Sequence, residues 1–485
     1  MLDYSLSKLL FKSNENKLLV FAQEGICEIT EIKSLLNKNG YTVYEYLSAQ
    51  EFRIVFEEKI KNSLDKIAVI VLAASYVPFD IRRAFYEVTL SASTIFPEFN
   101  LNAVSKYLKD WDIISFAANS SYADYSHKSQ TNDFIKSTVF SEQIIRKYCE
   151  NALIKLKEDC ENALSYLDWI RIAQKKASVE YYAALRELTF DMTFADSLFQ
   201  NFINDGYGRL STEVSGKFPP IITKAIPVIM ADKNAKSALI VMDGMSLFDF
   251  KAISYYLDEF QYDFGCSYAI IPTTTPISRQ SLLSGKFPRE LSKPFSLANE
   301  EREFKACIES YGISGSQIEY LRGYDAPTGP LTRFAAIIIN EADDIVHGQR
   351  QGRAGMLADM NLLGKSGKLQ SLINRLITAG FATYITSDHG NTLCAGVGSF
   401  RSGVEMQTSS KRMAVLKDFA EVNTLLAENT SEYQGFYLNK DYRYFVCNSG
   451  KSFDNKGEKV MAHGGMSLDE VIVPFIRIGW RNTNV

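Results

Sequence analysis

Three of the four histidines in this 485-residue chain stand next to acidic residues or glycines in short polar turns. His347 follows Asp343 by four residues, His389 directly follows Asp388, and His463 is followed by two glycines. A spacing of four residues places Asp343 and His347 on one face of a helical turn. Carboxylate oxygens and imidazole nitrogens form a mixed donor set that suits zinc or another first-row transition metal. The pattern therefore predicts a metal site.

A further aspartate, Asp243, ends the apolar segment 239–242 and precedes a glycine. Asp344 adjoins Asp343, and the spacing alone leaves open which of the two is the ligand. Together the acids and histidines suffice for two metal ions, each with three protein ligands and an open position. Two ions about 4 Å apart can stabilise both the attacking and the leaving oxygen of a phosphoryl displacement.

Three consecutive threonines follow an apolar segment, in residues 272–276, which read Pro-Thr-Thr-Thr-Pro. Residues 278–284 then read as a helix that ends at a glycine, and a helix N-terminus favours anions. A threonine hydroxyl that is activated by a metal can act as a nucleophile. Arg279 could bind a phosphate oxygen through its guanidinium fork, although a helix-surface role fits equally well. Residues 348–368 carry four basic residues among glycines, which is typical of a solvated loop and could also close over an anionic substrate.

The polar turns adjoin apolar segments rich in β-formers, which predict the strands of a sheet. The predicted strands are residues 238–242, 268–271, 335–339, 381–386 and 471–478. In parallel α/β sheets, binding sites gather at the carboxyl ends of the strands. We therefore expect the candidate residues to converge at one edge.

The preceding half of the chain predicts two other regions. Strands at 17–21, 41–46 and 67–73, with helices at 29–39 and 51–63, indicate a small α/β domain. Residues 133–203 lack glycine and proline and show helical spacing of apolar residues, and residues 206–236 contain three prolines and read as a connector. The predicted domains are residues 1–130, 131–235 and 236–485.

The composition excludes several classes of protein. With 46% hydrophobic and 23% charged residues, the chain is neither disordered, collagen-like nor a coiled coil. The net charge of −4 argues against a uniformly basic nucleic-acid binder. Seven scattered cysteines without a CxxC pair indicate reduced thiols, and no segment reads as a signal peptide or a membrane span. We therefore expect a cytoplasmic protein that does not contact a membrane.

The order of the motifs resembles the alkaline phosphatase superfamily and is most similar to its PglZ domain family, over residues 236 to 485. The superfamily pattern has a strand-end aspartate, a threonine or serine nucleophile, an Asp-x-x-x-His pair, an Asp-His pair and a late histidine. The matching residues here are Asp243, Thr275, Asp343 with His347, Asp388 with His389, and His463. The resemblance implies an α/β fold in which helices flank an alkaline-phosphatase-like sheet.

The resemblance also assigns roles to these residues. Thr275 would be the nucleophile or a metal ligand, because its distance from Gly285 matches the superfamily spacing, and Thr273 is the second choice. Arg279 would contact the phosphate. The metal next to Thr275 would be held by Asp243, Asp388 and His389, and the other by Asp343 (or Asp344), His347 and His463.

The function implied is that of a phosphoric ester hydrolase with two divalent metal ions, expected to be zinc. The preferred interpretation is a phosphodiesterase or nuclease that acts on nucleotides or nucleic acid. Residues 1–235 resemble the N-terminal part of PglZ proteins from BREX phage-defence islands, whose other proteins would be partners. The alternatives are a phosphomonoesterase and a non-catalytic scaffold subunit with a structural metal site. A structural zinc is closed by four protein ligands, which distinguishes it from an open catalytic site.

Overall fold

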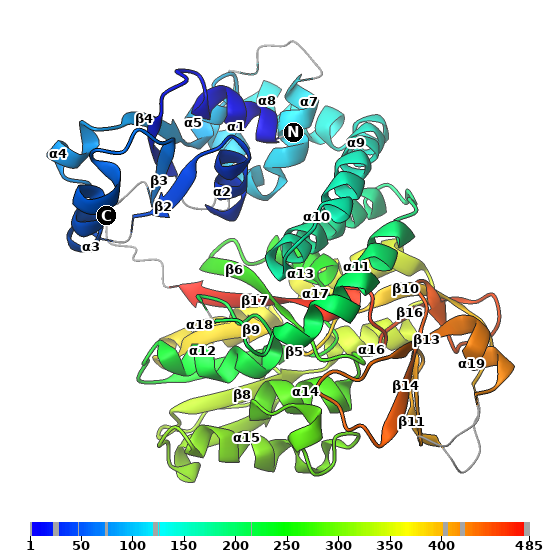
Figure 1. Cartoon of the computed structure of the whole chain (residues 1–485). Coiled ribbons are helices and arrows are strands. Elements are labelled where there is room, and N and C mark those ends of the chain that lie inside the picture. Colours follow the sequence, from blue (N-terminus) through cyan, green and yellow to red (C-terminus); the bar gives the residue numbers. More distant parts are fainter. Residues whose placement is uncertain are drawn as a thin grey trace. The chain divides into compact units, whose positions relative to one another are not determined.

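The computed structural model describes residues 2–22, 29–46, 48–72, 76–119, 125, 127–214, 216–400, 406–417 and 422–479 (Figure 1). The chain divides into two compact units, Met1–Tyr148 and Cys149–Val485. The predicted division into three domains stays a prediction.

The first unit is a small α/β domain, as the strand and helix patterns predicted. Its sheet has the order β2-β3-β1-β4, and all of its strand pairs are parallel. The strands are β1 (Lys17–Ala22), β2 (Thr42–Glu45), β3 (Ile67–Leu72) and β4 (Tyr86–Leu90). The helices are α1 (Leu2–Leu10), α2 (Ile29–Lys38), α3 (Ala49–Val55), α4 (Phe79–Arg82), α5 (Ala92–Ile95), α6 (Leu101–Val104), α7 (Trp111–Asn119) and α8 (Lys128–Phe134). The strand β3 lies at the core, because the side chains of its residues 67–71 are apolar and buried.

Three long helices follow, in the region whose helical spacing predicted them. They are α9 (Glu142–Glu161), which spans the boundary between the units, α10 (Tyr166–Ala184) and α11 (Thr193–Asp205). A capping box of Ser165 and Asp168 starts α10. The predicted connector contains a further helix, α12 (Ala225–Ala231), whose proline lies in its first turn, where a missing N–H costs nothing.

The second unit is built around a six-stranded sheet in the order β6-β17-β9-β5-β8-β7. Its strands are β5 (Ser237–Met242), β6 (Gln261–Tyr268), β7 (Ile318–Arg322), β8 (Phe334–Ile339), β9 (Ala382–Thr386) and β17 (Ile472–Gly479). β5, β7, β8 and β9 run parallel, and β17 is antiparallel to both β6 and β9.

The strand predicted at residues 268–271 is wrong in position, because β6 covers Gln261–Tyr268. The first half of β6 has exposed and half-buried side chains, so it lacks the buried apolar run from which strands were predicted. Residues 269–271 are buried and lead into the threonine turn.

Helices cover both faces of this sheet. Figure 1 shows α12, α14 (Thr275–Ser284) and α15 (Glu300–Glu309) on one face, and α13 (Leu247–Ser254), α17 (Gly352–Lys365) and α18 (Lys368–Thr378) on the other. The short helices α16 (Glu341–Gly348) and α20 (Leu468–Val471) lie at strand ends. The stretch 348–368 is therefore mostly helix and not a loop, and Arg353 in it, with 12% of its side chain exposed, forms ion pairs with Glu180 and Asp469.

A set of short strands is inserted between β9 and β17. One small sheet contains β10 (Thr392–Gly396), β15 (Lys451–Ser452) and β16 (Lys459–Ala462); the other contains β11 (Met406–Ser409), β12 (Met413–Lys417), β13 (Thr430–Tyr433) and β14 (Tyr442–Cys447). The helix α19 (Thr424–Asn429) packs against the second sheet. This insertion, drawn in orange to red in Figure 1, was not predicted.

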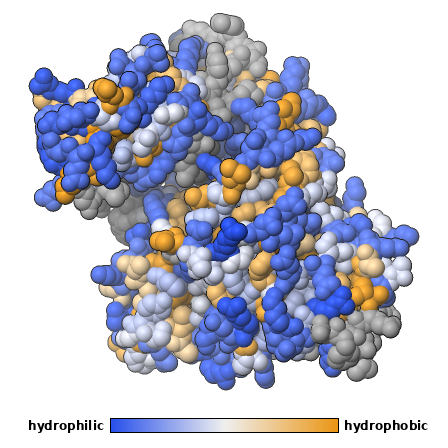
Figure 2. All heavy atoms as spheres, viewed as in Figure 1, coloured by the Kyte–Doolittle hydropathy of each residue, from blue (hydrophilic) through white to orange (hydrophobic). Residues whose placement is uncertain are grey.

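Within the described part of the chain, no helix is both long and apolar enough to span a membrane. On the face that Figure 2 shows, hydrophilic side chains predominate and apolar ones form small separate patches.

Candidate metal and catalytic site

The candidate residues lie at one edge of the six-stranded sheet. Asp243 directly follows β5, Asp388 lies two residues after β9, and Asp343 lies in the helix α16 that follows β8. Since β5, β8 and β9 are parallel neighbours, their carboxyl ends meet at the same edge. β17 runs the opposite way, so its beginning lies at this edge too and brings His463 there.

The first group of possible ligands consists of Asp243, Asp388 and His389. One ligand atom from each residue lies within 4.8 Å of the others. The Nε2 atom of His389 is 3.7 Å from an oxygen of Asp243 and 3.7 Å from an oxygen of Asp388. All three residues are buried.

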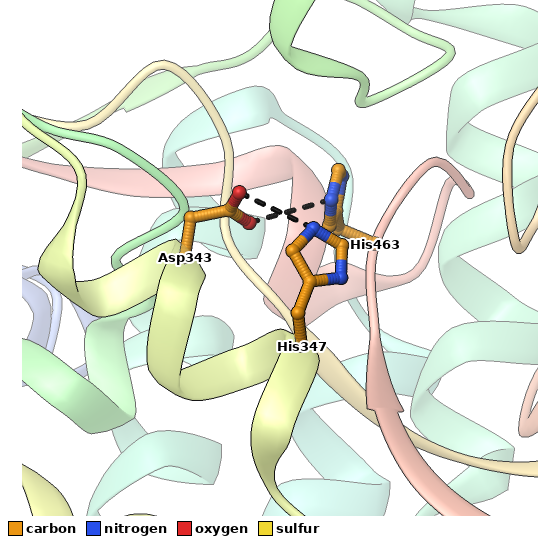
Figure 3. Close-up of side chains that lie close together, drawn as sticks. All are labelled: Asp343, His347 and His463. Atoms are coloured by element: carbon orange, nitrogen blue, oxygen red, sulfur yellow. Dashed lines mark ion pairs between the residues drawn. The ribbon is translucent and has the colours of Figure 1, made fainter.

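The second group consists of Asp343, His347 and His463, and its ligand atoms also lie within 4.8 Å of one another. The two oxygens of Asp343 face the two imidazoles (Figure 3): Oδ2 lies 3.3 Å from His347 Nε2, and Oδ1 lies 3.4 Å from His463 Nε2. Asp344 is exposed and outside the group, so the geometry favours Asp343 between the two.

The two groups are neighbours. The rings of His389 and His463 stack with their centroids 4.2 Å apart. Asp343 also lies close to the turn after Asp243, because a Cβ at Gly244 would be 3.1 Å from Asp343 Oδ1. The six residues thus form the two triplets that the resemblance implied, while their binding of metal stays a prediction.

Backbone carbonyls fix which nitrogen of each buried histidine carries the proton. His389 Nδ1 lies 3.0 Å from the carbonyl oxygen of Gly390, and His463 Nδ1 lies 3.1 Å from that of Thr273. A carbonyl oxygen only accepts, so Nδ1 carries the hydrogen and Nε2 keeps its lone pair toward the carboxylates. Metal-ligating histidines are commonly oriented in this way.

The ionisable groups of the site favour the binding of a cation, which would neutralise the buried carboxylates. Burial and the neighbouring Asp388 raise the pKa of Asp243 to about 8, and burial raises the pKa of Asp388 to about 6. Burial and His389 lower the pKa of His463 to about 4, so its imidazole is neutral near pH 7 and can bind a metal. Buried acids with raised pKa values release their protons readily when a metal ion binds.

The pKa values of the second pair follow from its contact. Burial acts to raise the pKa of Asp343. The hydrogen bond from His347 and the positive charge that His463 carries when it is protonated nevertheless hold this pKa below its usual range. The same hydrogen bond raises the pKa of His347.

Each group also contains a buried carboxylate oxygen that accepts no hydrogen bond from the described residues: Asp388 Oδ2 in the first group and Asp343 Oδ1 in the second. Burying a charged oxygen without a partner is costly, and a metal ion supplies the missing partner. The residues present therefore fit two metal ions.

The three threonines differ in what their hydroxyls contact. Thr275 Oγ1 lies 3.0 Å from His389 Nε2 and 3.4 Å from Asp243 Oδ1, at the start of α14. Thr273 is fully buried and donates to the carbonyl oxygen of Gly465, 2.8 Å away. The geometry therefore favours Thr275 over Thr273 as the nucleophile.

Arg279 is 1% exposed and lies among carboxylates. Its guanidinium donates to Asp243 and, from Nε, to Glu300 at 2.9 Å. Arg279 therefore orients Asp243, while a contact with a phosphate oxygen stays a prediction. Sequence reasoning missed Glu300 because it comes from a separate helix, α15, at no regular spacing from Arg279.

Two further residues that sequence reasoning missed hold the turn after His463. Glu470 accepts from the backbone N–H of Gly465 at 2.7 Å and pairs with Arg412 at 3.0 Å, and both side chains are buried. The capping box of Ser467 and Glu470 is a signal that could have pointed to the acid. No spacing signal points to Arg412.

The Asp-His-Gly-Asn sequence after β9 is held equally tightly. The Asn391 amide donates to the carbonyl oxygen of Gly244 at 2.9 Å and thereby ties this turn to the one after Asp243. A Cβ at Gly390 would lie 2.0 Å from the carbonyl oxygen of Asp469, so only glycine fits there. The tight packing fixes the directions of Asp388 and His389 before any ligand binds.

The fold and the site define an alkaline-phosphatase-like domain, and comparison with known families agrees. Residues 222–478, more than half of the chain, match the family described as the BREX system PglZ alkaline phosphatase-like domain. The chain belongs to this PglZ family, which confirms the resemblance inferred from its motifs.

Several solved structures match about half of the chain. Murine ectonucleotide pyrophosphatase / phosphodiesterase 5 is 14% identical, with 50% of this chain and 87% of that chain covered and a TM-score of 0.37. Its human counterpart is 16% identical, with the same coverage and a TM-score of 0.36. Phosphonoacetate hydrolase from Sinorhizobium meliloti 1021 is 11% identical, with 50% and 90% covered and a TM-score of 0.33. These scores are too low to assign a function. A search of curated proteins finds no significant match.

Proposed function

We propose that this protein is a zinc-dependent phosphodiesterase that cleaves nucleotides or nucleic acid in bacterial phage defence. One observation carries the proposal: a threonine hydroxyl lies directly beside one of two adjacent groups of three metal-ligand candidates. The PglZ family membership supports an alkaline-phosphatase-like hydrolase and the BREX context.

The donor sets support two catalytic ions over one structural ion. The first group offers two carboxylates and an imidazole, and the second offers one carboxylate and two imidazoles. Such mixed oxygen and nitrogen sets suit zinc. Three protein ligands at each position leave room for a substrate oxygen, whereas a structural zinc is closed by four protein ligands.

In the proposed reaction, Thr275 Oγ1 attacks phosphorus and forms a phosphothreonine diester, and one ester oxygen leaves as an alcohol. The Thr275 hydroxyl releases its proton to solvent water, and the leaving oxygen takes up a proton from water on the opposite side of phosphorus. Water then cleaves the bond to Thr275, which releases a phosphate monoester and restores the hydroxyl. The bound metal ions would supply positive charge that polarises the phosphate and lowers the pKa of the hydroxyl.

Neighbouring side chains hold Asp243 in place beside Thr275. Arg279 donates to Oδ2 of Asp243 and is itself held by Glu300, which leaves Oδ1 of Asp243 facing the Thr275 hydroxyl. His389 presents a lone pair because Gly390 holds its Nδ1–H. The protein therefore supplies a rigid set of donors that does not have to reorganise during the reaction.

The proposed setting is the cytoplasm, together with other proteins of a BREX-like defence island. This part of the proposal is supported by the family membership and by the scattered cysteines, six of which are free in the described residues.

The test combines metal analysis with turnover of bis(p-nitrophenyl) phosphate, before and after removal of metal by a chelator. We expect two zinc ions per chain and a diesterase activity that chelation abolishes and zinc restores. Turnover of p-nitrophenyl phosphate alone would favour the phosphomonoesterase. Bound zinc without turnover of either ester would contradict the proposal and favour the scaffold.

A further inference from the structure

A cavity of about 270 Å³ opens beside the candidate site. Three of its lining residues, Thr275, His347 and His463, belong to the site itself. The cavity therefore gives access to the Thr275 hydroxyl from outside the site. Its volume lies near the lower end of the range for small-molecule sites, which is about 300 to 1,000 Å³. It has room for a phosphate and one attached group.

Another wall of the cavity comes from two segments outside the metal site. Phe295 precedes α15, and Ser410, Lys411 and Met413 come from the β11–β12 hairpin of the insertion. None of these four residues belongs to a group of metal-ligand candidates. The wall is free to recognise the part of the substrate that is not the scissile phosphate.

Phe295 offers a flat apolar surface in this wall. It is half-buried, and Tyr442 contacts it at a near right angle, with the ring centroids 5.8 Å apart and an interplanar angle of 83°. A perpendicular contact occupies at most one face of the Phe295 ring and limits its motion. A fixed aromatic face beside a phosphate site suits the stacking of a nucleobase.

Lys411 is the one lysine or arginine among the described residues that line the cavity. It pairs with Asp454 at 3.4 Å and lines the same cavity as Thr275 and His347. Its ammonium group is therefore placed to meet an anionic group that enters this cavity. Phe295 provides an aromatic face and Lys411 provides a positive charge. Sites that bind single-stranded nucleic acid combine the same two features.

We propose that Phe295 and Lys411 form a nucleotide subsite, in which Phe295 stacks on the base of one ester group and Lys411 binds an oxygen of the scissile phosphate. The inference rests on the proposed diesterase function and adds a preference for esters that carry a nucleobase.

The test compares two substrates with the same leaving group: the p-nitrophenyl ester of thymidine monophosphate, and methyl p-nitrophenyl phosphate, which lacks a base. Phe295→Ala should raise KM for the thymidine ester by about 5-fold to 150-fold, the range for loss of one base–aromatic stack, and leave KM for the methyl ester and both kcat values unchanged. Phe295→Tyr should retain the wild-type KM. Phe287→Ala is the matched control, because Phe287 stacks on Tyr437 outside the cavity lining.

Lys411→Met should raise KM for both esters, since both carry the phosphate, and Lys411→Arg should restore most of the loss. Unchanged KM values for both esters in Lys411→Met would overturn the role of the lysine. Equal effects of Phe295→Ala on the two esters, or none on either, would overturn the stacking role.

A binding measurement separates this inference from the proposed function. Calorimetry would compare thymidine monophosphate with deoxyribose phosphate on zinc-loaded Thr275→Ala protein, with and without Phe295→Ala. If Phe295→Ala weakens the binding of thymidine monophosphate and leaves that of deoxyribose phosphate unchanged, the subsite is supported. This holds even if the wild-type protein hydrolyses no diester, in which case only the proposed function fails. Equal affinities for the two ligands in the presence of Phe295 would refute the subsite, whatever the activity.

Discussion

The three neighbouring threonines provide a sharp test of the proposed nucleophile, because the structure assigns each a different role. Thr275→Ala removes the hydroxyl beside His389 and Asp243. Loss of a covalent nucleophile should lower kcat by about a thousand-fold or more. Loss of the hydroxyl's contacts should lower the free energy of unfolding by only about 1 kcal/mol.

Thr273→Ala should have the opposite signature. The Thr273 hydroxyl donates to the carbonyl oxygen of Gly465 at 2.8 Å and accepts from the N–H of Gly464 at 3.2 Å, in a fully buried position. Two hydrogen bonds at about 0.5 to 1.5 kcal/mol each give a loss of about 1 to 3 kcal/mol. Thr274→Ala is the matched control, because its hydroxyl has no hydrogen-bond partner among the described residues and little stability should be lost.

The assay measures bis(p-nitrophenyl) phosphate turnover, zinc content and melting temperature for the three variants side by side. We expect Thr275→Ala to keep its zinc, to show only a small decrease in melting temperature and to lose its activity. If Thr273→Ala alone abolishes turnover while its fold is intact, the nucleophile is misassigned by two residues. If all three variants retain near-normal rates, attack by water would replace attack by threonine and the proposed mechanism would fail.

Three further predictions concern the ligands and their surroundings. Asp388→Ala and His389→Ala should each lower zinc content and melting temperature, because metal binding energy is linked to folding; unchanged zinc stoichiometry in both variants, by elemental analysis, would refute the ligand assignment. In the metal-free fold the pKa of Asp243 is about 8, above its unfolded value of 3.8. The stability that the protonated carboxyl contributes is therefore fully present below about pH 4 and is lost as the pH rises through 8. Zinc should therefore raise the melting temperature more at pH 8 than at pH 5, and a scan with and without chelator that shows no such trend would contradict this. Arg412→Met should destabilise the fold by about 3 to 5 kcal/mol, because it leaves the buried carboxylate of Glu470 unpaired, and adding Glu470→Gln should recover part of the loss in denaturant unfolding; a double variant less stable than the single one would be inconsistent with the pairing.

Sequence patterns located the site because its ligands lie at the ends of buried strands. β5, β8 and β9 are short apolar runs that end at polar residues, so both their positions and their convergence could be predicted. His463 reaches the same edge for a different reason than expected. The strand β17 is antiparallel to β9, so the first residues of β17, and His463 before them, lie at the carboxyl end of β9.

Residues that act through distant partners could not be predicted. The contact of Arg279 with a phosphate oxygen stays a prediction, whereas its pairing with Glu300 could not be predicted because no spacing rule connects the two residues. Arg353 lies in a stretch whose composition is typical of a solvated loop, yet it lies on α17 and pairs with Glu180 and Asp469. Both cases depend on the tertiary fold and leave no local pattern.

The insertion between β9 and β17 was missed for a related reason. Its strands have only 2 to 6 residues and are stabilised by pairing with one another, so none carries a strong pattern of its own. Lys411, which lines the cavity, belongs to this region and was missed with it.

The central claim is that two metal ions lie side by side at the edge of the sheet. Anomalous X-ray diffraction at the zinc absorption edge, on crystals of the zinc-loaded protein, tests it most directly. We expect two peaks about 4 Å apart, one among Asp243, Asp388 and His389 and the other among Asp343, His347 and His463. A single peak closed by four protein ligands, or no peak within either group, would contradict the account.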